Sequence, residues 1–351
     1  MMTSFSRVYL FFLVQLVHYD KYIESGVKLS KQPTTPIYGG QALVEGVMMG
    51  GGQHTVSAIR RNDGSIDYYY AKRVKNPMYQ KMKKIPLIRG IIALIESAAN
   101  GSKHLQFASD RYDVNPGEEL SAAEKEKNAS KLQLWLGVAA IGVLSFLFGK
   151  FVFTLIPIFL AQLLHNQFPS DTAQILLESA FKLVLLVSYI YLVSLTPIIK
   201  RVFQYHGSEH KVINCYENGE ELTVENVQKQ SRLHYRCGSS FMLFTVFVGM
   251  VLYFFVPVDP LWLRVVDRIL LIPVVLGISF EVLQATNACR NIPGLKFLGY
   301  PGLWLQLLTT KEPKDDQVEV AIASFKKLKE IEADPSIIET VHQDETKAMS
   351  H

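Results

Sequence analysis

Four long apolar blocks constrain the fold of this chain more than any other feature of its sequence. They span Leu132 to Leu164, Ala173 to Ile199, Phe241 to Val256 and Ile269 to Ala288. A helix needs about 20 apolar residues to cross the hydrocarbon core of a bilayer, so the blocks predict transmembrane helices. The first block is longer than this and is expected to tilt, or to bend near Lys150 or Pro157, whereas the third is near the lower limit. A hydrophobic content of 49% and a mean hydropathy of +0.15 agree with a polytopic membrane protein.

The Lys and Arg residues that flank these blocks predict their orientation. Asn166 to Thr172 carries none, and Pro257 to Arg268 carries only Arg264 and Arg268, whereas residues 201–240 and the N-terminal region carry many. Short loops rich in Lys and Arg stay on the cytoplasmic side of membranes. We therefore predict a multi-pass protein of the cell membrane, with both termini and residues 201–240 in the cytosol.

The net charge of +4 is spread along the chain without a dense basic tract, which argues against a nucleic-acid partner. The expected partner is the lipid bilayer, and protein partners stay open. Three cysteines, Cys215, Cys237 and Cys289, are too few and too scattered for a secreted disulfide framework. They fit reduced cytosolic thiols or metal ligands better.

The region before the first block is predicted to form a small cytosolic α+β portion. Residues 36–52 read PIYGGQALVEGVMMGGG, which has neither the ending of a phosphate-binding loop nor G-x-G-x-x-G, so we interpret it as a packed turn. Thr55 to Arg61 and Ser65 to Arg73 flank an Asp-Gly pair and predict a β-hairpin. Ile85 to Gly101 has helical apolar spacing but is interrupted by charges, which predicts an amphipathic or partly re-entrant helix.

Residues 205–241 gather the histidines and carboxylates that point to chemistry. His206, Glu209 and His210 form H-x-x-E-H, and on a helix residues four apart share a face, so both imidazoles can bind one ion. This is the inverted form of the zincin motif. In such enzymes the carboxylate activates metal-bound water, whose pKa the metal lowers to about 7. Glu209 is therefore the predicted general base.

A second half-motif follows in the same segment. His234 and Cys237 form H-x-x-C, a spacing that lets both side chains face one ion. Together with His206 and His210 they predict a tetrahedral zinc site, with Arg236 positioned to stabilise a developing oxyanion. A closed four-ligand shell favours a structural role, because a catalytic zinc keeps one position open for water. Solvated juxtamembrane histidines and a buried apolar cysteine are the alternative interpretation.

One ionisable side chain, Glu281, falls inside the fourth apolar block. An ionisable group at membrane depth is costly and suggests function. It also fits a buried ion pair with an arginine such as Arg89 or Arg290. Transport would draw on Glu281, although four spans without internal repeats make a poor transporter.

Several long motifs, in order, give the chain a resemblance to the YqhQ family of bacterial multi-pass membrane proteins, which are described as predicted metal-dependent enzymes. They are GGQALVEGVMM at 39–49, LIRGIIALIES at 87–97, RVFQYHGSEHKVINCYE at 201–217, LTVENV at 222–227, HYRCGSSF at 234–241 and PGLWLQLLTTKEP at 301–313. The resemblance implies that His206, Glu209, His210, His234, Arg236 and Cys237 belong to the family's characteristic site. This chain departs from the family pattern at Gly50, Tyr235 and Phe280, and none of these departures removes a proposed ligand.

The predicted fold is mainly α: a polytopic helical membrane protein with a small α+β cytosolic portion. Its predicted parts are an N-terminal extension (1–35), a cytosolic region with the glycine-rich turn, hairpin and amphipathic helix (36–131), two transmembrane helices (132–199), a cytosolic metal-site loop (200–240), two further transmembrane helices (241–288), an interfacial hairpin and amphipathic helix (289–331) and a disordered tail (332–351). The leading functional hypothesis is a metal-dependent hydrolase at the membrane surface. The alternative is a non-enzymatic scaffold or assembly factor with a structural zinc site.

Overall fold

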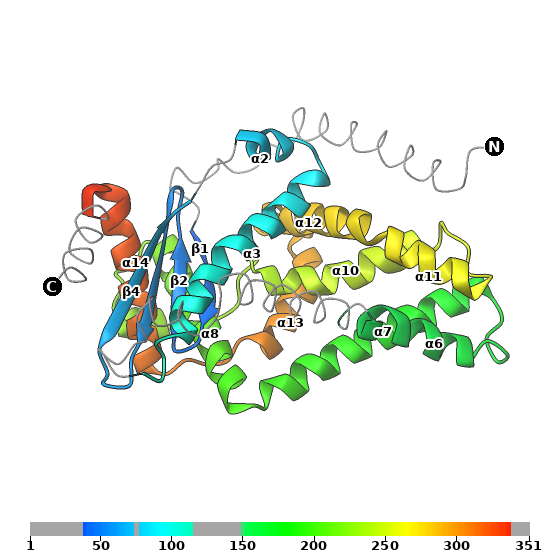
Figure 1. The fold of residues 1–351 in the computed structure, drawn as a ribbon, viewed down its shortest axis with the longest axis horizontal. Coiled ribbons are helices and arrows are strands. Elements are labelled where there is room, and N and C mark those ends of the chain that lie inside the picture. The colour runs from blue at the N-terminus through cyan, green and yellow to red at the C-terminus, as the bar shows by residue number, and fades with distance from the viewer. Residues whose placement is uncertain (1–37, 74–76, 115–148, 150, 338–351) are drawn as a thin grey trace, which may run out of the picture.

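The computed structural model describes residues 38–73, 77–114, 149 and 151–337. Within them the chain is mainly helical, with one four-stranded antiparallel sheet. The sheet and the helices that cover it form one end of an elongated molecule, and a group of apolar helices forms the other end (Figure 1). The predicted N-terminal extension, most of the first apolar block and most of the predicted disordered tail lie outside the described residues.

The sheet is a meander in the order β1-β2-β3-β4, formed by consecutive hairpins. The strands are β1 (Gly39–Leu43), β2 (Gly46–Gly50), β3 (His54–Arg60) and β4 (Ile66–Lys72). The β3-β4 hairpin turns at Gly64, whose positive φ of 86° suits glycine, as the Asp-Gly pair predicts. The glycine-rich stretch is a pair of strands rather than the packed turn that its composition suggests, and it turns at Glu45, whose φ is 52°.

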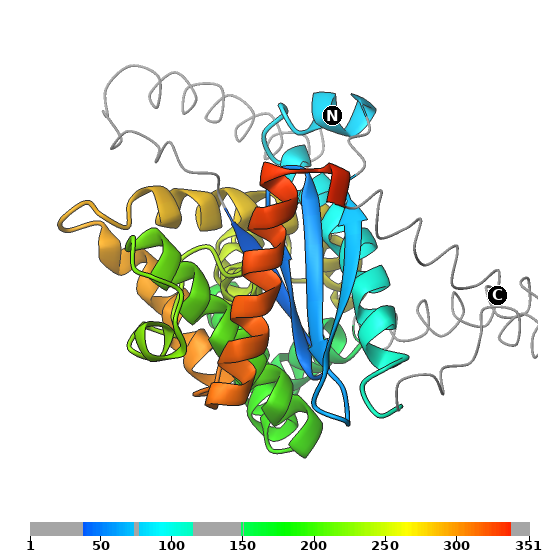
Figure 2. The ribbon, with the colours of Figure 1, turned by 90° about the vertical axis from the view of Figure 1, so that its left-hand side faces the viewer.

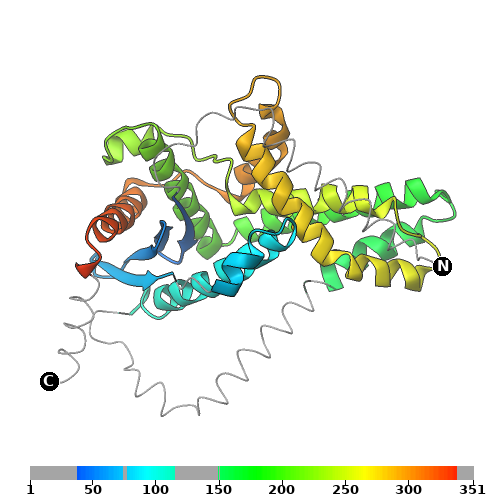
Figure 3. The same cartoon turned by 90° about the horizontal axis from the view of Figure 1, so that it is seen from above.

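Helices cover both faces of the sheet (Figures 2 and 3). One face packs against α8 (Pro197–Glu217) and α14 (Asp315–Ala333), through a core that includes Val47, Met49 and Phe325. The opposite face packs against α3 (Ile88–Ser109), through Met48 and Phe107. Neighbouring side chains of β2 thus point to opposite faces, as the two-residue period of a strand requires. Two layers of helix therefore bury the whole of β2.

The C-terminal amphipathic helix agrees with its sequence pattern. Its apolar stripe is buried against the sheet and α8, and comprises Val318, Ala321, Ile322, Phe325 and Leu328. A short helix, α9 (Val224–Gln228), packs beside it. The helix α2 (Pro77–Met82) precedes α3.

The apolar helices extend away from the sheet. They are α6 (Ile156–Leu163), which follows a π-helical turn over Phe151–Leu155, α7 (Asp171–Ser194), α10 (Gly238–Tyr253), α11 (Leu261–Leu270) and α12 (Ile272–Ala288). Of the described helices, α7 alone is long and apolar enough to cross a membrane unaided, and α11 and α12 pass the same test as a pair bent by 49°. The predicted third span, α10, is a shorter apolar helix.

Two boundaries differ from the sequence-based expectation. The predicted loop over residues 200–240 begins as helix α8, which follows α7 after a break at Leu195 and Thr196 and continues to Glu217. The predicted interfacial hairpin contains α13 (Tyr300–Thr309), in which Pro301 lies in the first turn. Proline is tolerated there because the first N–H groups of a helix have no intrahelical acceptor.

Candidate metal centre

Helix α8 presents the first half of the predicted site. The rings of His206 and His210, one turn apart, lie with their centroids 4.5 Å from each other. The backbone of α8 is held close to the segment after α13, where the Lys311 N–H donates to the Phe203 carbonyl over 2.8 Å. A β-carbon at Gly207 would collide with the Lys311 carbonyl. Glycine inside this helix therefore permits the close approach of a second backbone segment.

The second half of the site is a short turn before α10. The Gln306 amide, fully buried on α13, accepts from the His234 N–H and donates to the His234 carbonyl, each over 2.8 Å. Cys237 is the N-cap of α10, and its sulfur accepts from the Ser239 N–H over 3.4 Å. The sulfur therefore lies at the N-terminal, positive end of the α10 dipole.

The two halves meet. The Nε2 atom of His206 lies 3.2 Å from the Cys237 sulfur, and one ligand atom from each of His206, His210 and Cys237 lies within 4.8 Å of the others. Bonds of 2.0–2.1 Å to nitrogen and 2.3 Å to sulfur around a tetrahedral ion separate those atoms by about 3.5 Å. In this group of three residues, which we call the ligand cluster, the His206–Cys237 pair is near that spacing, and separations of up to 4.8 Å would have to shorten by about 1 Å around a shared zinc ion.

The surroundings of the ligand cluster suit a metal as well. The Nδ1 atom of His206 lies 2.8 Å from the Thr309 carbonyl, and that of His210 lies 2.7 Å from the Arg232 carbonyl. A carbonyl only accepts, so both rings carry a proton on Nδ1, and in a neutral imidazole Nε2 is then the nitrogen available as a ligand. Metal-binding histidines are oriented in this way by partners beyond the metal. Two oriented imidazoles and a helix-capping thiol are a donor set that fits zinc.

The structure does not include His234 in the ligand cluster. Its ring centroid lies 5.6 Å from that of His210, and its Nε2 lies 3.9 Å from a Glu217 oxygen, which is too long for a hydrogen bond. That nitrogen is buried and has no hydrogen-bond partner among the described residues. Burial lowers the pKa of His234 to about 4, so the imidazole is neutral at pH 7. Arg236, the predicted oxyanion-stabilising residue, forms an ion pair with Glu217.

Glu209 is buried beside the ligand cluster. Burial is the main cause that raises its pKa to about 7, and the charge of His206 and the Gly40 N–H oppose the shift. A β-carbon at Gly40 would contact the Glu209 carboxyl carbon at 3.1 Å, so glycine in β1 lets the strand approach this carboxylate. A carboxylate with a pKa near neutrality has the property expected of a general base.

All six predicted site residues line one cavity of about 360 Å³, between β1, the middle of α8 and the start of α10. They are His206, Glu209, His210, His234, Arg236 and Cys237. The glycine-rich segment supplies the opposite wall, through the residues from Tyr38 to Ala42. Residues far apart in the sequence thus converge on one space large enough for water or a small ligand group.

Sequence reasoning missed three residues that shape this site. Glu217 pairs with Arg236, and contacts with His234 and Arg236 lower its pKa to about 2 although burial raises it. It lies seven residues after His210 on the same helix face, which is a usable signal. Gln306 and Thr309 act through contacts with residues more than 65 positions away, and their spacing carries no such signal.

Glu281 has a structural partner. Its carboxylate accepts from the Arg89 Nε over 2.7 Å and from the Leu87 N–H over 3.2 Å. It does not line the cavity that holds the ligand cluster. Of the two interpretations of this residue, the pair with Arg89 is the one that the contacts support.

Fold and site together define a mainly helical protein with a small antiparallel sheet and a cluster of histidine and cysteine between the two. The chain belongs to the family described as "Protein of unknown function (DUF1385)", which it matches over residues 85–331. It is 65% identical over 305 residues to the "Uncharacterized protein YqhQ" of Bacillus subtilis (strain 168), across 87% of this chain and 96% of that protein. The resemblance to the YqhQ family is thereby confirmed. No solved structure matches the chain.

Proposed function

We propose that this chain is an integral membrane protein that binds zinc through His206, His210 and Cys237 and acts as a hydrolase at the membrane surface. The observation that carries the proposal is the convergence of three ligand atoms within 4.8 Å, on a cavity that Glu209 also lines. Three protein ligands leave a fourth position open, which is the arrangement of catalytic rather than structural zinc sites.

The apolar helices support the membrane part of the proposal. Only 28% of the most apolar window of α7 is buried, and Val184, Leu192 and Leu195 are more than half exposed. A core helix of a soluble protein buries such residues. Helix α7 therefore presents to its surroundings the surface that a bilayer covers.

The distribution of charged and apolar side chains on helix α11 also supports a membrane location. Its arginines, Arg264 and Arg268, are buried, while Trp262 and Leu270 are 66% and 55% exposed. Charges inside and apolar side chains outside suit a hydrocarbon solvent, in which ionisable residues face the interior of the helix bundle.

The roles of the chain's own groups follow from their positions. His206 and His210 would hold zinc through Nε2, while the carbonyls of Thr309 and Arg232 fix the orientation of their rings. A bound zinc ion would supply Lewis-acid polarisation of a substrate oxygen and lower the pKa of a coordinated water. Glu209 accepts a proton from the attacking water at its carboxylate. Arg236 is held by Glu217 on the cavity wall, where its charge faces an incoming anionic group.

The scaffold alternative rests on His234. Its Nε2 is buried and has no hydrogen-bond partner among the described residues, which makes it a candidate fourth ligand, and a shell closed by it would have no position for water. The ring would have to turn from Glu217 towards His210. A closed shell would clamp α8 and the start of α10 together without catalysis.

The metal content of the purified protein tests both the catalytic and the structural zinc site. The full-length protein, purified without chelator, is expected to contain one equivalent of zinc by elemental analysis. The His206→Ala, His210→Ala double variant should lose it, and His54→Ala, which removes a buried histidine away from this cavity, should keep it. Equal metal content in the double variant and the wild type would refute the metal site.

A second pair of variants separates catalysis from scaffolding. Glu209→Gln is expected to keep zinc but to fail to complement a strain that lacks the gene. His234→Ala should keep zinc if three ligands suffice. Complementation by Glu209→Gln, together with loss of zinc from His234→Ala, would favour the scaffold.

A further inference from the structure

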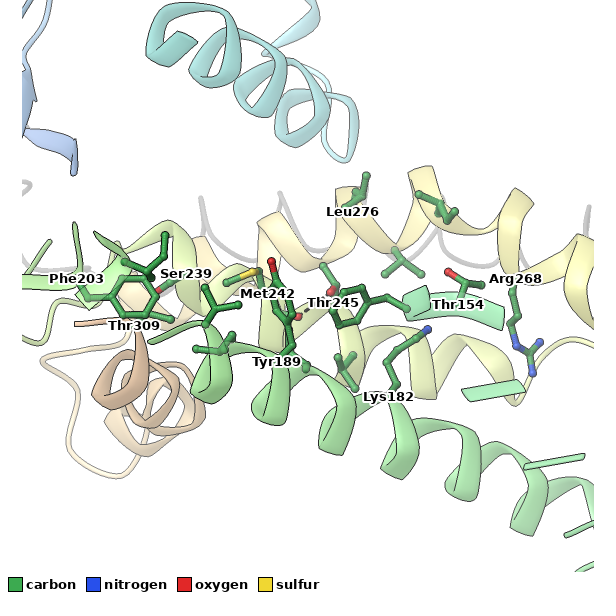
Figure 4. A pocket seen from close by; sticks show the side chains of 18 of the residues that line it. Thr154, Lys182, Tyr189, Phe203, Ser239, Met242, Thr245, Arg268, Leu276 and Thr309 are labelled. Carbon is green, nitrogen blue, oxygen red and sulfur yellow. Dashed lines mark hydrogen bonds between the residues drawn. The ribbon is translucent and has the colours of Figure 1, made fainter. Parts of the chain in front are cut away.

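A second cavity, of about 560 Å³, forms a groove bounded by α7, α10 and α12 (Figure 4). Its middle is lined by aliphatic and aromatic side chains, among them Leu186, Ile190, Val246 and Leu276. One end reaches Phe203, His206 and Ser239, which also line the cavity of the ligand cluster. The two cavities therefore share a wall, and the groove leads away from it into the apolar helices.

The groove is long and narrow. Along α10 it is lined from Ser239 to Tyr253, and a rise of 1.5 Å for each of the 14 steps between them gives a length of about 21 Å. One leaflet of a bilayer contributes about 15 Å of the hydrocarbon core. A groove of this length and lining matches one extended acyl chain.

The far end of the groove is positively charged. Arg268 and Arg264 share one carboxylate, that of Glu178, over 3.2 Å and 3.0 Å, and all three side chains are at most 1% exposed. The charge of one guanidinium is therefore not balanced within this group. The Nη1 atom of Arg268 is buried and has no hydrogen-bond partner in the part of the chain that the structure describes. Buried donors and charges without partners are costly.

Lys182 adds a second cation at the same end (Figure 4). Its ammonium group donates to the Tyr253 hydroxyl over 3.2 Å, and among the described residues no carboxylate forms an ion pair with it. The Arg268 guanidinium lies over the same tyrosine ring, 3.9 Å from its centroid. Two cations thus converge at one end of an apolar groove.

We propose that this groove binds a single-chain anionic amphiphile, a long-chain fatty acid, with its carboxylate on Lys182 and Arg268 and its chain along α10 towards His206. The carboxylate pairs with the Lys182 ammonium, the nearby Arg268 guanidinium adds positive charge at the same end, and the chain covers the aliphatic walls. An extended peptide fits less well, because its backbone N–H and C=O groups would face apolar walls without partners. A bulky headgroup does not fit at a guanidinium that is fully buried.

This site does not depend on the proposed zinc chemistry. The chain of the ligand ends beside His206, so an occupied groove would shield that side of the ligand cluster from lipid. His210 lines the cavity of the ligand cluster but not the groove. Variants at His210 therefore separate the two sites.

The test uses a fatty acid that carries a photoreactive diazirine midway along its chain. Full-length protein is reconstituted in phosphatidylcholine vesicles and irradiated, and labelled peptides are identified by mass spectrometry. We expect labelling of α7 and α10 within the groove, with competition by excess palmitate and at least about tenfold weaker competition by hexadecanol, because a hydrogen-bonded charge strengthens binding by that order.

Matched variants make the result specific. Met242 lines the groove and Val251 does not, and both lie on α10 and are exposed, at 38% and 50%. Met242→Trp should abolish groove labelling and Val251→Trp should leave it unchanged. Lys182→Met should remove the preference for palmitate over hexadecanol. His210→Ala should lose zinc and keep the label, which separates failure of the zinc site from failure of this one.

Two results would overturn the proposal. Absence of label from the groove in the wild type would show that the fatty acid does not bind there. Equal labelling of the wild type and Met242→Trp, or equal competition by hexadecanol and palmitate, would show that the label reports general contact with lipid.

Discussion

Gln306 orients the turn that carries His234 and Cys237. Its amide makes three hydrogen bonds of 2.8 Å, to the His234 N–H, the His234 carbonyl and the Ser240 hydroxyl. Gln306→Leu would leave the His234 N–H buried and unpaired, at about 1–3 kcal/mol, and would leave the His234 carbonyl with only the Cys237 N–H, at 3.3 Å. We expect a clear loss of thermal stability and of zinc content in the purified protein.

Gln204→Leu is the control for this substitution, because its amide contacts Glu312 and Gln317 in more exposed surroundings. It should change the melting temperature little. A Gln306→Leu protein that melts like the wild type would show that the turn is held by other contacts.

Gly207 tests the packing of α8 against the segment after α13. Alanine is favoured over glycine inside a helix by about 1 kcal/mol, but here its β-carbon would displace the Lys311 carbonyl. The collision outweighs the propensity, so Gly207→Ala is expected to destabilise the protein by roughly 1–3 kcal/mol, the usual cost of overpacking. Gly238→Ala is the matched control, since a β-carbon at Gly238 would have nothing within 4 Å of it, and it should be neutral. The measurement is thermal unfolding of the two variants. A Gly207→Ala protein more stable than the wild type would contradict the close packing of α8 against the Lys311 carbonyl.

At the scale of elements, His104 links α3 to the sheet through side-chain hydrogen bonds. Its ring nitrogens lie 2.6 Å from the Ser57 hydroxyl and 2.9 Å from the Thr55 hydroxyl, both on β3. Burial is the main cause that lowers the pKa of His104 to about 4 from 6.5. The unfolded chain therefore binds this proton more readily than the folded chain does, and stability that is present above pH 6.5 is lost as the pH falls towards 4.

The expected loss over that window is about 2–3 kcal/mol at most. It is measured as the fall in melting temperature between about pH 7 and pH 4.5, which brackets most of that window. His104→Gln, which keeps a hydrogen-bonding side chain that does not titrate, should be less stable at neutral pH but flatter with pH. An unchanged pH dependence in His104→Gln would assign the effect to other groups.

The same elements show what a sequence can and cannot predict. The apolar stripe of α14 and the Asp-Gly turn are local patterns, and both agree with the structure. The sequence of β1 and β2 predicts a turn because glycine has a low strand propensity. The helices that bury these strands, α8 and α14, are distant in sequence, so no local pattern reveals them. Pro301 is expected from the sequence to break a helix. In the structure it lies in the first turn of α13, where proline is tolerated, and the sequence alone does not show where that helix begins.

At the scale of the whole molecule, the site lies where the sheet meets the apolar helices, and the groove starts from it (Figures 1 and 4). The sequence draws attention to six of the residues that line the cavity, because their spacing within two short motifs is typical of metal ligands and their neighbours. It does not indicate that His234 faces Glu217, because that depends on how α8 and α13 pack around the turn. Candidate ligands can thus be proposed from the sequence, whereas which of them lie close together depends on tertiary contacts.

The orientation of the molecule in a membrane is the prediction with the widest consequence. The segment after α8 carries Lys229, which is 61% exposed, and the loop between α6 and α7 carries Pro169, which is also exposed. If Lys and Arg stay in the cytosol, these positions lie on opposite sides of the membrane. In a variant without native cysteines, Pro169→Cys should react with a membrane-impermeant thiol reagent in intact cells. Lys229→Cys should react only after the cells are opened. The reverse pattern would place the cavity of the ligand cluster outside the cell, where a thiol ligand is prone to oxidation and a hydrolase would meet a different set of substrates.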